Sequence, residues 1–430
     1  MKTIFKTAGF AALMLGTSLS ATAATKIIYA GQLLAVPGQA AKAEQTIVIN
    51  KGKITQVRDG YVAAKEFGKK VRVIDLKNSF VMPGLMDMHV HLQGELGPKN
   101  DSENLKMSSE LMGMRSIHYA MKTMKAGFTT VRDVGSDAQQ MYALRDAINN
   151  GWVNGPRIIA AGGVGITGGH ADISGVKHDL MDVYTEKTIC DGPYDCRRAT
   201  RRAIKYGADL IKITSTGGVL TDRATGTGQQ MEMDELREVV TAAKRMGRKV
   251  ASHAHQADGI NAALEAGVDS IEHGTYTNKK SIKLFKKTGA YLVPTLLAGA
   301  TVKHMAETSN FLSPAIAAKA IKVGGDMKGN FGKAYKAGVK IAFGTDSGVS
   351  KHGINAQEAV LMHEAGMTEM DVIKSATVNA ADLIDMSDSL GTIEAGKYAD
   401  IIATDGSPLE DIKELLSVDF VMKGGKIYKK

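Results

Sequence analysis

Residues 80–91, with the sequence FVMPGLMDMHVH, give the first indication of the fold. They form an apolar run that ends in His89 and His91. Because a β-strand points successive side chains to opposite faces, two histidines one residue apart project from the same face. Two imidazoles on one face at a strand end can bind a metal ion. The same spacing also occurs on surfaces and in cores where the rings have other partners.

Similar runs recur along the chain and predict a barrel. Apolar or β-branched runs lie at 81–90, 129–134, 157–161, 210–214, 250–254, 270–272, 291–295 and 340–343. Each is followed by residues with helical apolar spacing, such as 234–240, where Met233 or Asp234 would begin a helix with an acidic first turn. Alternating strands and helices of this number predict a (β/α)8 TIM barrel, with a doubly wound sheet as the alternative.

Polar side chains stand at the ends of these predicted strands. They are Lys212, His253, His255, His273 and Asp346. In a barrel, side chains at the carboxyl ends of different strands meet at one mouth, which is where active sites lie. A lysine among apolar neighbours is costly unless it is paired or chemically changed, although it could also extend toward water. A buried carboxylate needs a cation.

Both ends of the chain have a different residue pattern from the middle. Short alternating runs with turn residues lie between 27 and 81, and again between 399 and 428. Such runs are typical of small antiparallel β-structure. We therefore predict one discontinuous β-sandwich domain from residues 24–82 and 386–430, with the barrel between them at 83–385.

The first residues predict export. Lys2 and Lys6 precede an apolar stretch at 8–19, followed by Ala21, Thr22 and Ala23. This is the order of a secretory signal peptide, here residues 1–23, and a buried N-terminal helix would not explain it. The apolar stretch is shorter than the roughly 20 residues that cross a membrane. We expect a periplasmic or secreted protein with no stable membrane insertion.

The charge distribution gives no indication of nucleic-acid binding. The formal net charge is +9. The lysines are spread as pairs, such as those at 279–280 and 286–287, and no dense basic run alternates with aromatic residues. The excess of basic residues therefore indicates solvated helix surfaces, with a weak attraction for anionic substrates.

The two cysteines predict a disulfide. Cys190 and Cys196 flank the turn-rich segment DGPYD. In an oxidising compartment they could close a small ring that stabilises the fold by about 2 kcal/mol. A zinc site would need a second pair of ligands. We predict a structural disulfide, conditional on export.

Seven stretches together resemble the amidohydrolase superfamily. They are MPGLMDMHVH at 82–91, GFTTVRD at 127–133, IKI at 211–213, HAH at 253–255, GVDSIEHG at 267–274, GTD at 344–346 and GTIEAGKYAD at 391–400. They span nearly the whole chain after the predicted signal. Within the superfamily the chain is most similar to the metal-dependent dipeptidase and carboxypeptidase branch. That branch is often described as Xaa-Pro dipeptidase or imidazolonepropionase-related and includes ochratoxin-hydrolysing amidases.

The resemblance implies a binuclear centre, usually of zinc, at the mouth of the barrel. It assigns the ligands by position: His89, His91 and Asp346 to the first cation, His253 and His273 to the second. Lys212, carboxylated on its amine, would bridge both cations, which also removes the cost of a buried ammonium.

The residues around such a centre would have distinct roles. Two cations a few ångströms apart lower the pKa of a bridging water, so that hydroxide exists at neutral pH, and they polarise the scissile carbonyl. Asp346 could take the proton and return it to the departing amine. His255 would then orient a ligand or contact substrate, or be a packed core histidine.

Candidate substrate contacts lie on loops that follow the strands. His170 follows the third strand and could meet the substrate's carbonyl or carboxylate, or be an ordinary loop histidine. Arg223 and Tyr276 are candidate anchors for a substrate carboxylate. Arg223 could instead be a solvated side chain.

These assignments predict an exported amidohydrolase that releases the C-terminal amino acid from a dipeptide, short peptide or N-acyl amino acid. The alternatives are hydrolysis of a cyclic amide and deamination. Deaminases of the superfamily and imidazolonepropionase lack the bridging lysine, whereas Lys212 is present. A silent binding protein on the same barrel would be expected to have lost a ligand, and none is missing. Assemblies are common in this branch, so this chain could also form a homo-oligomer.

Overall fold

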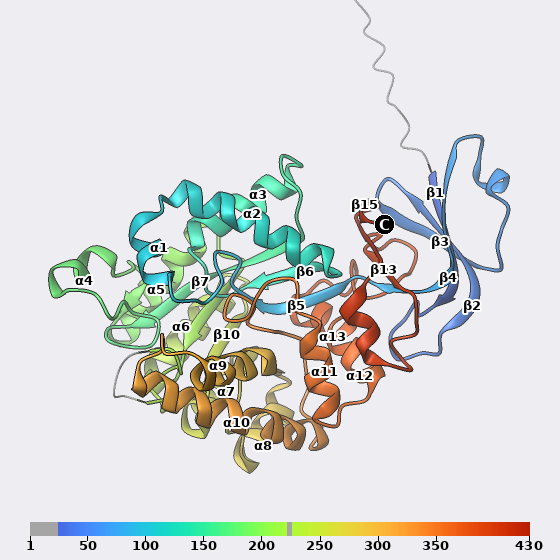
Figure 1. Cartoon of the computed structure of the whole chain (residues 1–430). Helices are drawn as coiled ribbons and strands as arrows, with labels where there is room; N and C mark the ends of the chain where they lie inside the picture. The colour runs from blue at the N-terminus through green and yellow to red at the C-terminus, as the bar shows by residue number, and fades with distance from the viewer. Residues whose placement is uncertain (1–24, 222–225) are drawn as a thin grey trace, which may run out of the picture.

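A computed structural model describes residues 25–221 and 226–430 (Figure 1). The predicted signal peptide therefore lies outside the described residues. The middle of the chain forms a barrel of parallel strands surrounded by helices, and both ends of the chain join in a separate sheet. The long strand β4 (Val71–Pro83) runs from that sheet directly into the first barrel strand (Figure 1).

Seven regular strands follow one another around the barrel in chain order, and each neighbouring pair is parallel. They are β5 (Leu85–Val90), β6 (Phe128–Asp133), β7 (Arg157–Ile166), β9 (Leu210–Thr214), β10 (Val250–Ala254), β11 (Ser270–His273) and β12 (Tyr291–Val293). The short strand β8 (Ile189–Cys190) pairs with the end of β7.

The predicted eighth strand closes the barrel without forming a regular ladder. The backbone of Leu292 exchanges hydrogen bonds with Lys340 and Ala342, at 2.9 and 3.1 Å. On the other side, the Met88 amide donates to the Phe343 carbonyl at 2.8 Å. Segment 340–343 therefore bridges β12 and β5, and the predicted (β/α)8 barrel is confirmed.

Helices alternate with these strands and cover the barrel. They are α1 (Asn100–Lys106), α2 (Ser109–Lys125), α3 (Ala138–Asn149), α4 (His178–Tyr184), α5 (Gly192–Tyr206), α6 (Met233–Arg245), α7 (Ala257–Ala266), α8 (Lys279–Thr288), α9 (Leu296–Thr308), α10 (Pro314–Lys336), α11 (Gln357–Glu364), α12 (Glu369–Ser375) and α13 (Val378–Leu383). The predicted start of α6 is correct, because Glu232 and Glu235 form a capping box there. None of the helices in the described residues is long and apolar enough to cross a membrane.

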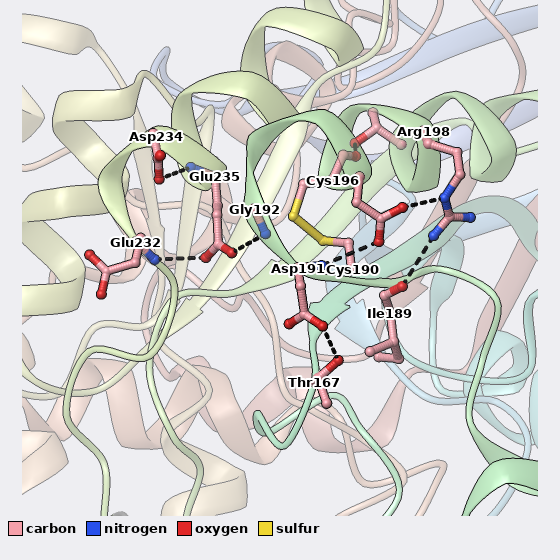
Figure 2. The surroundings of a disulfide bond; sticks show 12 residues. Thr167, Ile189, Cys190, Asp191, Gly192, Cys196, Arg198, Glu232, Asp234 and Glu235 are labelled. Atoms are coloured by element: carbon pink, nitrogen blue, oxygen red, sulfur yellow. Dashed lines mark hydrogen bonds and ion pairs between the residues drawn. A yellow bond between two sulfur atoms is a disulfide. The ribbon is translucent and has the colours of Figure 1, made fainter.

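The end of β7 is tied to the surrounding helices by a disulfide. Figure 2 shows Cys190 of β8 bonded to Cys196 of α5. Beside it, the Glu235 carboxylate accepts hydrogen bonds from the amides of Gly192 and Glu232, at 2.8 and 2.9 Å. This carboxylate links the first turns of α5 and α6, so the disulfide lies in a braced part of the barrel's outer layer.

A small apolar cluster fills the barrel below its mouth. Val134, Ala161, Leu210 and Ala251 form this cluster, and all four are buried. Ala161, Leu210 and Ala251 lie on β7, β9 and β10, where alternate residues face the helices, and Val134 directly follows β6. We call this cluster the apolar floor, because it lies inside the barrel next to the polar residues of the mouth.

The two chain ends form a mixed sheet of seven strands with its own buried cluster. The strands are β1 (Thr25–Leu33), β2 (Lys42–Asn50), β3 (Lys53–Asp59), β4, β13 (Ile401–Thr404), β14 (Phe420–Lys423) and β15 (Lys426–Lys429). Strand β4 pairs with β1 in parallel and with β13 in antiparallel orientation, while the other pairs are antiparallel. Two short 3₁₀ helices, Ala64–Phe67 and Ile412–Ser417, lie in the connections.

Candidate metal centre

Two groups of three potential metal ligands lie at the mouth of the barrel. The first is His89, His91 and Asp346, and the second is His253, His255 and His273. Within each group the ligand atoms lie within 4.8 Å of one another. The histidines come from the carboxyl ends of β5, β10 and β11 or the residue just beyond, and Asp346 follows the closing segment. Parallel strands thus bring together residues that are far apart in sequence.

The first group surrounds a carboxylate oxygen. The His91 and His89 Nε2 atoms lie 2.8 and 3.5 Å from Asp346 Oδ1. This oxygen is buried and makes no well-directed hydrogen bond within the described residues. Burial raises the pKa of Asp346, but the two histidines outweigh it and bring the pKa below its usual range. Nitrogen and oxygen lone pairs that converge without a shared proton fit a bound cation.

His89 is held from behind by a buried ion pair. Its Nδ1 lies 2.8 Å from Glu272 Oε2, while Glu272 Oε1 accepts a hydrogen bond from Arg132 Nη2 at 2.7 Å. The Glu272 pKa falls to about 2, because Arg132 and His89 outweigh the effect of its burial. With Nδ1 occupied, Nε2 is left to face the site, which is how a carboxylate commonly orients a metal-binding histidine.

The second group consists of three histidines whose rings contact one another. The His273 ring centroid lies 4.6 Å from that of His253 and 4.9 Å from that of His255. His273 Nδ1 lies 2.7 Å from Thr295 Oγ1, and His255 Nδ1 lies 2.9 Å from Thr275 Oγ1. Burial lowers the pKa of all three rings, to about 3 for His255. They are therefore neutral at physiological pH, the form that binds metal.

The backbone is strained at this mouth. His273, Thr295 and Asp346 have φ values of 70°, 51° and 58°. The left-handed region is unusual for residues other than glycine and more so for a β-branched threonine. Such strain persists only where the surrounding structure imposes it, and it clusters at functional sites.

Lys212 lines the same cavity as the two groups and has no hydrogen-bond or ion-pair partner among the described residues. It lies on β9 and is 8% exposed. Burial lowers its pKa, although Glu272 and Asp346 act in the opposite direction. A buried amine of this kind is costly for packing alone and is expected at a functional site.

One cavity of about 910 Å³ connects these residues. Its lining includes all six ligands, Lys212 and His170. The His170 ring centroid lies 4.4 Å from that of His253, and its Nδ1 contacts the Thr221 hydroxyl. Burial, reinforced by Lys212, lowers the His170 pKa to about 4. The structure therefore places this loop histidine beside the second group, facing the space where a substrate would lie.

Of the other two predicted substrate contacts, the structure describes only Tyr276 and does not bring it to the site. The Tyr276 hydroxyl donates to Asp326 at 2.9 Å, and Tyr276 is not among the residues that line the cavity. Burial and Asp326 raise its pKa to about 12. Arg223 lies outside the described residues. Sequence reasoning also left His255 outside the ligand sets, whereas its ring nitrogen lies with those of His253 and His273.

Sequence reasoning missed Arg132 and Glu272 as parts of the site. A signal was present, because both are charged residues inside runs that were predicted to be buried strands. Buried charges of this kind need a partner. Together the donor set, the orphaned oxygen of Asp346 and the partnerless Lys212 fit a pair of divalent cations.

Comparison with known proteins gives consistent results. The model of the Amidohydrolase family matches residues 80–428. Ochratoxinase from Aspergillus niger is 31% identical over 433 residues, covering 94% of this chain and 86% of that protein. An imidazolonepropionase from Fusobacterium nucleatum is 25% identical over 410 residues, covering 89% of this chain and 90% of that protein.

Solved structures agree with the sequence comparison. A Xaa-Pro dipeptidase with methionine bound in its active site is 43% identical, with a TM-score of 0.91, and the alignment covers 95% of this chain and 100% of that one. A prolidase in complex with N-methylphosphonate-L-proline is 29% identical, with a TM-score of 0.85 and coverage of 94% and 100%. The chain therefore belongs to the amidohydrolase family and is a hydrolase of carbon–nitrogen bonds.

Proposed function

We propose that this protein is an exported binuclear zinc amidohydrolase that releases the C-terminal amino acid from dipeptides, short peptides or N-acyl amino acids. One observation carries the proposal: two groups of metal ligands line a single cavity, and Lys212 lines the same cavity. The similar proteins named ochratoxinase, Xaa-Pro dipeptidase and prolidase support hydrolysis of an amide bond. Export rests on the sequence of residues 1–23 alone.

The residues of the first group would hold one cation, and His253 and His273 the other. Bound there, two divalent cations would supply a water of lowered pKa and polarise the scissile carbonyl. Asp346 lines the cavity, and its Oδ1 has no hydrogen bond within the described residues, so it would accept the proton of the attacking water and pass it to the leaving amine nitrogen. His170 and His255 would contact the substrate, and His255 is also close enough to act as a ligand.

Lys212 would be carboxylated on its amine. Only a neutral amine reacts with carbon dioxide, and burial lowers the pKa of this lysine toward that form. The resulting carbamate would carry a negative charge into the cavity that both groups of ligands line. It would also replace a buried ammonium that has no partner in the described part of the chain.

The test is amine release from a panel of dipeptides and N-acyl amino acids, with purified protein reconstituted with zinc and bicarbonate. Lys212→Ala and Asp346→Ala should each abolish turnover, whereas Tyr276→Phe, whose side chain is directed to Asp326, should retain it. Metal analysis should find two zinc ions per chain in the wild type. No release from any member by the two-metal form would refute the peptidase assignment and direct attention to cyclic amides and deamination substrates.

A further inference from the structure

Gly163 of the barrel faces open space, whereas a Cβ added to any other glycine in the described strands would meet a neighbouring atom. Four glycines lie in the described strands, Gly31 of β1 and Gly162, Gly163 and Gly165 of β7. A Cβ added to Gly163 would meet no atom within 4 Å. Although it lies in the middle of a barrel strand, Gly163 is exposed. Gly163 is also among the residues that line the cavity, so the open space beside it is part of that cavity.

Neither packing nor backbone conformation requires glycine at this position. A Cβ on Gly162 would lie 2.6 Å from the Ala203 Cβ, and one on Gly165 would lie 2.6 Å from that of Ala171. Those two glycines allow close contact, whereas a Cβ on Gly163 would contact nothing. Its φ also lies outside the left-handed region that favours glycine. In a strand, where glycine is less favourable than other residues, an unneeded glycine calls for another explanation.

The open space belongs to the catalytic mouth. Gly163 pairs with Lys212 of the neighbouring strand, so a side chain there would point to the same face of the sheet as Lys212. Ala161 lies two residues earlier on that face and forms the apolar floor with Val134. Val219 also lines the cavity. This part of the cavity is thus polar on the side of Lys212 and apolar on the side of Ala161 and Val134.

We propose that Gly163 determines substrate size: its bare backbone receives a bulky apolar group, of phenyl size, next to the scissile amide. This inference rests on the proposed amidase function and names its substrate class. Ala161 and Val134 favour an apolar group over a charged one, because a charged group would lose solvation against them. The group belongs either to the acyl side or to the released amino acid.

The experiment fills the space and compares three compounds. N-acetylglycine has no bulky group, N-benzoylglycine has one on the acyl side, and N-acetyl-L-phenylalanine has one on the amino acid. Gly163→Val adds a β-branched side chain that suits a strand, while Gly163→Ala is the graded control that adds a single carbon. Each is assayed for kcat/KM with zinc-loaded protein, together with metal content and Tm.

The wild type should prefer one bulky compound to N-acetylglycine. Gly163→Val should lower kcat/KM for that compound by about 10- to 100-fold, the loss expected when an apolar group of this size is no longer buried. N-acetylglycine should change by less than about threefold, with Tm and two bound zinc ions retained. Gly163→Ala should fall between the wild type and the valine variant. The compound that is affected identifies the side of the amide.

Several results would overturn the inference. They are a wild type without preference for a bulky compound, an equal loss on all three compounds, no loss at all, or an unfolded valine variant. Loss of zinc from Gly163→Val would show that the space serves the metal centre instead. If the wild type hydrolyses none of the compounds, the proposed function fails, and calorimetric binding of the same compounds to both proteins still decides the role of Gly163.

Discussion

At the scale of single residues, the orientation of His89 depends on Glu272. The carboxylate contacts His89 through one oxygen and Arg132 through the other, and all three side chains are buried. Glu272→Gln keeps the size of the side chain but removes its charge, so it leaves Arg132 without a counterion. We expect kcat to fall by about 10- to 100-fold, with weaker zinc binding in the first group. Amidase assays and metal analysis measure both.

Glu235→Gln is the matched control for this variant. Like Glu272, Glu235 is a buried carboxylate. It accepts its hydrogen bonds from backbone amides, and it is not among the residues that line the cavity. It should retain both zinc ions and kcat. Equal losses in the two variants would show that Glu272 contributes only to folding. Unchanged zinc binding in Glu272→Gln would contradict its role in orienting His89.

The ligands could be predicted at this scale, but their partners could not. His89, His253, His273 and Asp346 each end or follow an apolar run, so their place at one mouth follows from barrel geometry. Glu272 contacts His89 across 183 positions of sequence, and no local pattern records such a pairing. Tyr276 was predicted to bind a substrate carboxylate because a phenol suits that group. In the structure its hydroxyl donates to the carboxylate of Asp326 instead.

At the scale of elements, the start of α9 is bound to α11 by a buried carboxyl group. Glu358 accepts hydrogen bonds from the amides of Leu296 and Leu297, at 2.9 and 2.6 Å. Burial raises its pKa from an ordinary value of 4.5 to about 8. The folded state therefore keeps a proton that the unfolded chain releases above pH 4.5. By linkage, the stability of the metal-free protein should fall as pH rises from about 5 to about 8.

Glu358→Gln tests this linkage, because glutamine cannot titrate. Urea unfolding of the metal-free proteins at several pH values should show a smaller decrease in unfolding free energy for the variant over this range. The comparison concerns the slope, since the amide also loses one acceptor and lowers stability at every pH. Parallel slopes would show that another group causes the pH dependence.

A second prediction at this scale concerns the disulfide between β8 and α5 (Figure 2). Replacing both Cys190 and Cys196 with alanine should lower the free energy of unfolding by about 2 kcal/mol, as expected for the loss of a short covalent loop. Reducing agent should destabilise the wild type by a similar amount. The alanine variant is its control, because it should not respond. A wild type that is insensitive to reduction would contradict the prediction.

Element types were predicted better than element boundaries. The run at 81–90 was predicted as one strand, but the structure ends β4 at Pro83 and begins β5 at Leu85. Pro83 has no amide hydrogen for a ladder, and a Cβ on Gly84 would lie 2.3 Å from Thr129 Oγ1. The break therefore follows from a close contact with β6, which the local sequence does not reveal.

At the scale of the whole molecule, bound metal would join distant parts of the barrel. The six ligands come from β5, β10, β11 and the segments that follow the strands, so binding would favour only the folded state. A free metal concentration 100-fold above Kd adds about 2.7 kcal/mol of stability per site. We expect a chelator to lower Tm by several degrees and zinc to restore it. Differential scanning calorimetry measures the change.

The control is a variant that lacks one ligand from each group, His89→Ala with His253→Ala. Its Tm should change little on chelation, because neither group remains complete. If the wild type and this variant responded alike, the stabilising metal would lie elsewhere.

The barrel itself could be predicted from its repeating strand and helix pattern. The sequence also predicted that the two chain ends share a domain, but not that β4 pairs with β13, since these strands lie about 320 positions apart.

That pairing also has a consequence for the order of folding during synthesis. Strand β4 leaves the ribosome before the barrel, but its neighbour β13 at Ile401–Thr404 emerges only after every barrel strand. Until then one edge of β4 has no partner, and an unpaired strand edge is prone to aggregation. Nascent chains that stall before residue 401 would thus expose an unpaired edge of β4 that can pair with other chains. Chaperone binding would matter most at that stage.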